Sequence, residues 1–312
     1  CCVPGTTEDQ VWIIVKRTIN GSVERHIEYF EKSERIDKTD PWYVFGGVKA
    51  DTGDESYTID TVSSPSPNRI KLKMVSATGA NFSAGEFIKI TGATKFADSS
   101  QLHEICTQNT GGGPGVWRVD TPTEAGGYSY VLLKREDADT FAEYGSMAGM
   151  TQNSGTATRV LNTFTAAHLA LETVTVSGGG SEEEQVTLNS SGVGTTKEYY
   201  PSITAGLGVD ADCVPLGLDT PDDFGEPRAI RKVKVRMVDS NCLEVGPDTD
   251  NLDAVTFRQV VDKMDEAPSL SSEIVERSIP QKVSTTGRIV LRAPKESNMA
   301  CNIAGLVVEY ET

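Results

Sequence analysis

The stretch from Val11 to Phe30 constrains the fold of this chain more than any other part of its sequence. Two runs rich in β-branched and aromatic residues flank one Asn20-Gly21 pair, which is the strongest local signal for a β-hairpin. A type I′ turn requires positive φ at both central positions, and Asn and Gly adopt that conformation most readily. We therefore predict two antiparallel strands joined at Asn20-Gly21.

A two-residue turn also fixes how the two strands pair. The expected register places four pairs opposite each other: Ile19 and Ser22, Arg17 and Glu24, Ile14 and Ile27, and Trp12 and Tyr29. The second pair predicts a cross-strand ion pair and the last an aromatic pair, each stabilising the hairpin by roughly 0.2–1 kcal/mol. Because a two-stranded hairpin is only marginally stable alone, we expect it to pack on a larger body.

The rest of the chain also shows strand patterns. The Pro- and Ser-rich run 63–68 is typical of a linker, and it opens a segment in which Ile70, Leu72 and Met74 alternate with lysines. Further short apolar runs follow as far as Leu133, which predicts a small β-barrel-like domain inserted into the parent chain.

The predicted fold is therefore mainly β, with antiparallel β-sandwich or barrel domains, an inserted small β domain and little helix. We expect three parts: a β platform over 1–62 and 146–215 that begins with the hairpin at 11–30, the inserted domain over 63–145, and a C-terminal β domain over 216–312. The sequence begins at Cys1 without Met, and we expect it to be cut from a longer polypeptide.

Composition narrows the function classes. The chain has 312 residues and a formal net charge of −16 at pH 7, which argues against a tight grip on nucleic acid, since that needs Lys and Arg to neutralise phosphates. An acidic surface along which DNA slides without sticking is one interpretation, and simple solubility is the other. The sequence contains no run of 18 apolar residues, so we predict no membrane insertion.

No residue pattern in the sequence forms a recognisable active site. The chain has six Cys and three His, without a Cys-x-x-Cys pair or zinc-ligand spacing, so we expect reduced and mostly buried structural cysteines. The Gly-rich run 111–115 precedes a strand-like segment and lacks Gly-Lys-Ser/Thr, so it indicates a hairpin tip instead of a phosphate loop. We predict no catalytic residue, no metal and no cofactor, and therefore no enzyme.

A basic strand in the predicted C-terminal domain has two interpretations. In Ala229–Val238, apolar residues alternate with Arg231, Lys232, Lys234 and Arg236. Such a strip can bind DNA, but no aromatic residues are interleaved with it and the chain is acidic. An exposed face paired with acidic neighbours is the favoured interpretation.

Four segments resemble, in the same order, the tail nozzle and tail tube proteins of short-tailed bacteriophages. The first is EDQVWIIVKRTINGSVERHIEYFE, and the full set covers Glu8–Glu31, Phe164–Gly208, Ala229–Gly246 and Gly287–Tyr310. His168 stands at the family's His position, and a role as a satisfied core or turn residue is favoured over a catalytic role. Glu172 departs from the family pattern, which has Gly or Lys there, and Cys242 replaces a usual Gly.

The resemblance implies a structural virion protein: a subunit of a ring, usually a homohexamer, around the DNA exit channel of the tail, which helps retain and then pass the genome. It implies assembly in the host cytoplasm and a location in the virion tail. The implied partners are further copies of the chain, adaptor or portal-side tail proteins, and tail fibres or spikes, with genomic DNA only as a transient, non-specific cargo. A larger, propeller-like region normally precedes this part in the family.

Two sets of residues are candidates for assembly. The structural candidates are in the hairpin: Asn20, Gly21, Trp12, Tyr29, Arg17 and Glu24. The candidate lumen or contact loops contain Gly111, Gly112, Gly113, Gly178, Gly179, Gly180, Glu182 and Glu183. The alternative function is a host-surface glycan-binding or fibre-docking adhesin module that uses the inserted domain, and a tail-associated hydrolase is a third hypothesis.

Overall fold

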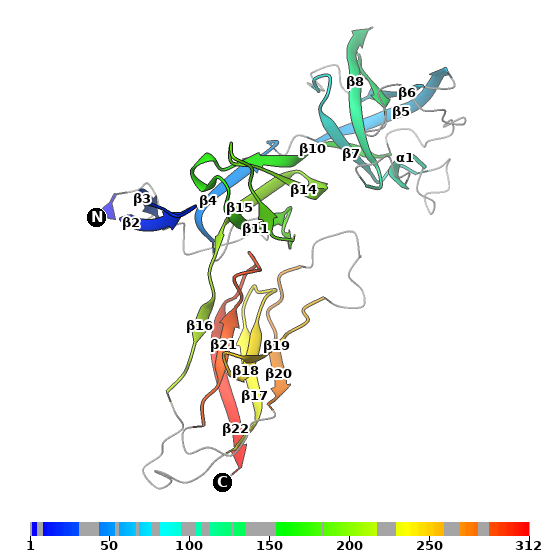
Figure 1. The fold of residues 1–312 in the computed structure, drawn as a ribbon. Coiled ribbons are helices and arrows are strands. Elements are labelled where there is room, and N and C mark those ends of the chain that lie inside the picture. The colour runs from blue at the N-terminus through cyan, green and yellow to red at the C-terminus, as the bar shows by residue number, and fades with distance from the viewer. Residues whose placement is uncertain are drawn as a thin grey trace. The chain divides into compact units, whose positions relative to one another are not determined.

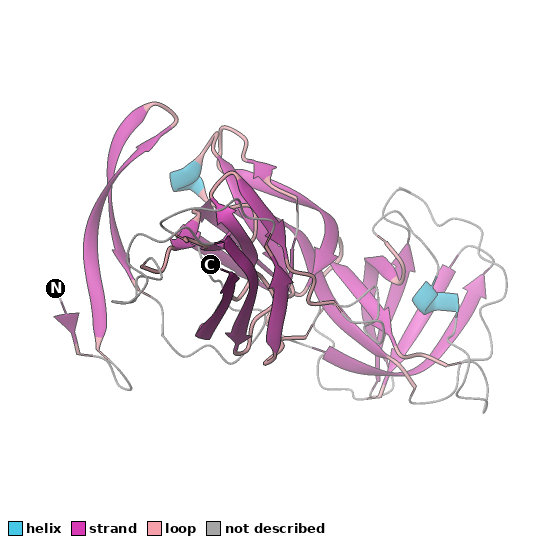
Figure 2. Ribbon diagram, turned by 90° about the horizontal axis from the view of Figure 1, so that it is seen from below, coloured by secondary structure: helices cyan, strands magenta, loops and turns pink. Residues whose placement is uncertain are grey.

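A computed structural model describes most of the chain and is dominated by strands (Figures 1 and 2). Strands make up about 65% and helices about 3% of the described residues, so the prediction of a mainly antiparallel β fold is confirmed. The described residues are 2–4, 9–30, 44–53, 56–66, 69–75, 82–94, 104–107, 113–125, 128–134, 154–182, 184–216, 229–258, 269–279 and 287–311. Among these residues, no helix is long and apolar enough to cross a membrane.

The N-terminal sheet contains the predicted hairpin. Its strands, in order, are β1 (Cys2–Val3), β2 (Gln10–Ile19) and β3 (Ser22–Tyr29). Asn20 and Gly21 have φ of 46° and 75°, as a type I′ turn requires. All four predicted cross-strand pairs are in register, and the rings of Trp12 and Tyr29 lie 5.1 Å apart between centroids. The register is therefore the one that a two-residue turn at Asn20-Gly21 requires.

A closed barrel forms the core of one of two compact units, which comprises residues 50–164 and 195–203. Its strands pair in the order β10-β5-β6-β9-β8-β7, and β7 pairs back onto β10, so the ring of six strands has no open edge. A further strand, β14 (Val193–Tyr200), pairs with the outside of β10. The barrel strands are β5 (Ser56–Ser66), β6 (Arg69–Met74), β7 (Phe87–Thr91), β8 (Val116–Ala125), β9 (Tyr128–Lys134) and β10 (Thr156–Thr165).

The barrel interior follows from the alternation seen in the sequence. Ile70, Leu72 and Met74 point inward and are almost fully buried, whereas the intervening lysines point outward. The fully buried Trp117 belongs to the same hydrophobic cluster, and its indole N–H donates to the carbonyl of Ile105 at 2.9 Å. Ile105 lies in the short helix α1 (Glu104–Thr107), so one hydrogen bond ties that helix to the core.

The barrel extends beyond the predicted inserted domain at 63–145. Closure uses β10, which begins at Thr156, and β5, which begins at Ser56. The local pattern predicts the individual strands, but a barrel needs a first and a last strand that meet, and this pairing is long-range.

The second unit comprises residues 1–49, 165–194 and 204–312, and it contains the hairpin and three other sheets. One of these sheets pairs in the order β12-β11-β15-β4, with β13 also on β11. Its strands are β4 (Val44–Asp51), β11 (Thr173–Gly178), β12 (Ser181–Glu182), β13 (Val186–Thr187) and β15 (Ser202–Gly208), and the 3₁₀ helix η1 (Ala167–Leu169) precedes β11.

The last two sheets form the C-terminal sandwich and share one hydrophobic cluster. Val233 and Val235 from one sheet and Val245 and Leu291 from the other belong to this core. The sheets pair in the orders β16-β21-β18-β19 and β20-β17-β22. The sandwich takes in β16, which lies before the predicted boundary at 216. Its strands are β16 (Ala211–Cys213), β17 (Ala229–Met237), β18 (Glu244–Asp248), β19 (Asn251–Ala254), β20 (Ile274–Ser278), β21 (Val290–Ala293) and β22 (Ile303–Glu311).

We expect Trp117→Ala to destabilise the barrel unit by about 3–5 kcal/mol, because it removes a fully buried indole and leaves the Ile105 carbonyl without its donor. Urea unfolding followed by circular dichroism measures this change. The control Leu216→Ala removes a side chain that is 94% exposed and should change stability by less than about 0.5 kcal/mol. Equal losses in the two variants would contradict the assignment of Trp117 to the core.

Candidate functional site

The β2–β3 hairpin has two chemically different faces, because successive side chains of a strand alternate between its sides. One face, the inner face, contacts other described parts of the same unit. The guanidinium of Arg17 lies 4.5 Å from the centre of the Phe45 ring, and the ring of His26 lies 5.8 Å from that of His168. At the tip of the hairpin, the backbone N–H of Asn20 donates to the Glu172 carboxylate.

The predicted ion pair between Arg17 and Glu24 is wrong. The two residues are opposite each other as expected, but the guanidinium binds both carboxylate oxygens of Glu28, at 2.9 and 2.6 Å. The Glu24 carboxylate lies 3.7 Å from Nε2 of His26 instead. Arg17 is long enough to reach diagonally along the inner face to a less exposed carboxylate, where a two-pronged charged hydrogen bond forms.

Electrostatics support this pairing. The hydrogen bond from Arg17, with the charges of Arg17, His26 and His168, lowers the pKa of Glu28 against the opposing effect of burial. Both side chains of the ion pair are mostly buried, with exposed fractions of 17% and 15%. The Arg17–Glu28 pair is therefore better protected from solvent than a surface ion pair.

His168 has a structural partner, as the favoured interpretation predicted. Its Nε2 lies 2.8 Å from the carbonyl oxygen of Gly46, which has a φ of 58° at the start of β4. The same ring faces His26 of the hairpin. His168 thus connects the hairpin to β4 through η1, where it is the middle residue.

The opposite face of the hairpin, the outer face, is exposed and apolar at both ends. Ile14 and Ile27 are a cross-strand pair with exposed fractions of 74% and 72%, and the side chain of Val23 is also exposed. In the middle of this face, Lys16 lies directly opposite Arg25. The outer face consists of Trp12, Ile14, Lys16, Thr18, Val23, Arg25, Ile27 and Tyr29.

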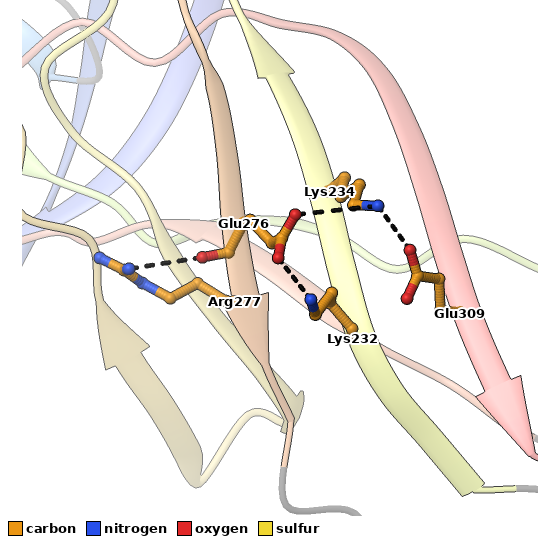
Figure 3. A network of polar contacts seen from close by, with 5 residues as sticks. All are labelled: Lys232, Lys234, Glu276, Arg277 and Glu309. Atoms are coloured by element: carbon orange, nitrogen blue, oxygen red, sulfur yellow. Dashed lines mark hydrogen bonds and ion pairs between the residues drawn. The ribbon is translucent and has the colours of Figure 1, made fainter.

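The basic strand β17 is paired with acidic neighbours, which confirms the favoured interpretation. Lys232 contacts Glu276 on β20, and Lys234 contacts Glu309 on β22, each at 2.5 Å (Figure 3). Glu276 also lies 3.8 Å from Lys234, so one carboxylate serves two lysines. The hydrogen bond from Lys232 lowers the pKa of Glu276, and the hydrogen bond to Glu309 raises the pKa of Lys234. These lysines are already neutralised within their own sheet.

The other sheet of the sandwich carries an acidic row on its outer side. Asp212 and Glu244 flank Arg292 in register, and Arg292 binds Asp212 through two hydrogen bonds of 2.6 and 2.9 Å. Burial raises the pKa of Glu244, and the nearby carboxylates of Glu296, Asp210 and Asp212 raise it further, against the effect of Arg292. Among the described residues, the side chain of Glu244 forms no hydrogen bond or ion pair. We define the acidic row as Asp210, Asp212, Glu244 and Glu296.

The predicted contact loops are spread over both units. Gly111, Gly112 and Glu183 lie outside the described residues. Gly113 lies in the barrel unit, where an added Cβ would approach a carboxylate oxygen of Glu198 to 2.8 Å. Gly178 ends β11, Gly179 and Gly180 form the turn with φ of 55° and 83°, and Glu182 ends β12.

The five described cysteines are free thiols, but only Cys301 is buried, so the expectation of mostly buried cysteines is wrong. Burial raises the pKa of the Cys301 thiol to about 12, whereas Cys2 and Cys213 are exposed. Within the described ranges, no group of three or more His, Cys, Asp or Glu residues is placed to hold a metal ion.

Sequence reasoning missed the partners of the inner face. Glu172, His168 and Phe45 reach the hairpin across long stretches of chain, and no local pattern indicates these contacts. The sequence singled out Glu172 only by its departure from the pattern of the tail proteins that the chain resembles, and in the structure its carboxylate accepts from the turn backbone of the hairpin.

Comparison of this sequence with models of known protein families finds no match, and comparison with curated proteins finds no significant match either.

The Glu28 carboxylate gives the docked hairpin a pH dependence. Because its pKa is lowered in the folded state, its contribution is complete above the pKa of the unfolded chain and is lost as the pH falls through the lowered value. At pH 7, we expect Glu28→Gln to reduce amide-exchange protection of residues 10–30 on the order of tenfold, and the difference from wild type should vanish in acid.

The matched control is Glu24→Gln on the same face of β3. Its carboxylate is 49% exposed and is not bound to Arg17, so exchange protection should stay near that of wild type. An equal effect of the two substitutions would contradict the assignment of the Arg17 ion pair to Glu28.

Proposed function

We propose that this chain is a structural subunit of the tail of a short-tailed bacteriophage, which assembles into a ring around the DNA exit channel. One observation carries the proposal: four ordered segments resemble the nozzle and tube family. Nearly all of their described residues fall in one compact unit, the unit of residues 1–49, 165–194 and 204–312. The barrel comes mainly from the sequence between the first two segments.

The distribution of charge supports a conduit that does not hold DNA. The chain has a net charge of −16, and several cations on the outer sides of the sandwich are bound to carboxylates. Affinity for DNA depends on cations that are free to displace counterions from phosphates. A surface of this kind repels the duplex and lets it pass.

The alternative, a glycan-binding or fibre-docking module on the barrel, stays a prediction. Its supporting feature is the outer side of β9, where Tyr130 and Tyr128 lie beside Lys71 and Lys73 with ring-to-ammonium distances of 3.9 and 3.8 Å.

Ring assembly is the direct test of the proposal. We expect the purified full chain to form closed oligomers that grow in population with concentration, visible as rings by negative-stain electron microscopy and as discrete masses by mass photometry. A chain that stays monomeric at every concentration, and is also monomeric in the assembled tail fraction, would refute a ring subunit.

The acidic conduit is tested by DNA binding. We expect the wild-type chain to bind duplex DNA more weakly than about 10⁻⁴ M at physiological salt, measured by fluorescence anisotropy. The double variant Glu276→Lys and Glu309→Lys would leave Lys232 and Lys234 unpaired and add two cations, so salt-sensitive binding should appear. Tight binding by the wild type would contradict a non-gripping channel.

A further inference from the structure

The outer face of the hairpin is an unusual surface for a chain that acts alone. Ile14, Ile27 and Val23 have exposed fractions of 74%, 72% and 56%. Ile14 and Ile27 adjoin each other as a cross-strand pair, and an exposed apolar surface of this kind is characteristic of an interaction site. The inner face of the same two strands is occupied, because Arg17 pairs with Glu28 there and His26 contacts His168.

Charge indicates what binds there. Lys16 and Arg25 lie directly opposite each other in the middle of the apolar surface, and like charges in that arrangement repel. Among the described residues, neither of them has an ion pair or hydrogen bond from its side chain. The face therefore needs a partner that supplies negative charge next to apolar groups.

The C-terminal sandwich offers the complementary surface. The four carboxylates of the acidic row lie near two cations, Arg292 and Lys295, which leaves an excess of two negative charges. The outer face carries two positive charges, those of Lys16 and Arg25. Val214 and Leu216 follow β16 in the chain with exposed fractions of 48% and 94%, so exposed apolar side chains come shortly after Asp212 of the row in sequence.

We propose that the outer face of the hairpin in one copy docks onto the acidic row of a second copy. This inference rests on the proposed ring and names its interface. The two surfaces are different parts of the chain, so each copy offers one of each, and the contact is heterologous. A heterologous contact generates a closed ring when its rotation closes, as the proposed ring requires.

The test uses two full-length charge-reversal variants. The hairpin variant is Lys16→Glu with Arg25→Glu, and the row variant is Glu244→Lys with Glu296→Lys. Each variant alone places like charges on both sides of the interface, so self-association should weaken by at least about tenfold in mass photometry. In an equimolar mixture, the acidic hairpin meets the basic row and the basic hairpin meets the acidic row, so alternating oligomers should form again.

If assembly returns on mixing, the variants have lost docking and are not misfolded. Circular dichroism and thermal unfolding check the fold of each variant separately. The matched control, Lys89→Glu with Arg236→Glu, has the same charge change as the hairpin variant at positions outside both surfaces, and it should assemble like wild type. Zero-length coupling of amines to carboxylates should also link Lys16 to Glu244 between isotope-labelled and unlabelled wild-type chains.

The outcomes distinguish this inference from the proposed function. A wild-type chain that assembles while the hairpin variant assembles equally well overturns the interface and leaves the ring intact. Weakened variants whose mixture stays dissociated also overturn the interface, because the hairpin then docks elsewhere. A wild-type chain that never assembles overturns the ring and the interface together.

Discussion

The two-residue turn at Asn20-Gly21 determines which side chains of the hairpin face the protein and which face outward. A shift of one residue in register would move the side chains of one strand to the opposite face relative to the other strand. Arg17 and Glu28 would then lie on opposite faces of the hairpin and could not pair. The positive φ angles of the turn residues therefore control both the docking of the hairpin and the character of its outer face.

The hairpin and the two larger cores are held by different forces. The barrel and the sandwich each bury a large apolar cluster, centred on residues such as Trp117 and Val235. Among the described residues of the hairpin, only Ile19 is a buried hydrophobic residue, and the hairpin's contacts with the rest of the unit include ring contacts and one backbone hydrogen bond. Since apolar burial supplies most of the stability of a fold, the hairpin should open more readily than either core.

Local patterns predicted the features that depend on neighbours in sequence. The turn at Asn20-Gly21, the inward alternation from Ile70 and the alternation of apolar and basic residues in β17 each follow from short-range rules. Barrel closure does not, because it pairs Ile90 with Ala157, and nothing in either strand specifies the other. The prediction that Arg17 pairs with Glu24 failed for a related reason. Register fixes which residues are opposite, whereas the reach and burial of a long side chain decide which carboxylate it binds. The alternation of β2 predicts which residues share the outer face, but the exposure of that face depends on which elements pack around it.

The two cations of the outer face favour a head-to-tail contact between copies over a symmetric one. Exposed apolar side chains such as Ile14 and Ile27 supply affinity for almost any apolar surface, including the same face of another copy. Two outer faces meeting each other would bring Lys16 and Arg25 of both copies together without a counterion, which disfavours a symmetric dimer. An acidic surface has no such penalty and also removes the repulsion between Lys16 and Arg25 within each hairpin. The charges thus disfavour the contact between two hairpins, which would end assembly at two copies. They favour the contact between a hairpin and an acidic row. With that contact, every open oligomer has one free hairpin at one end and one free acidic row at the other until the ring closes.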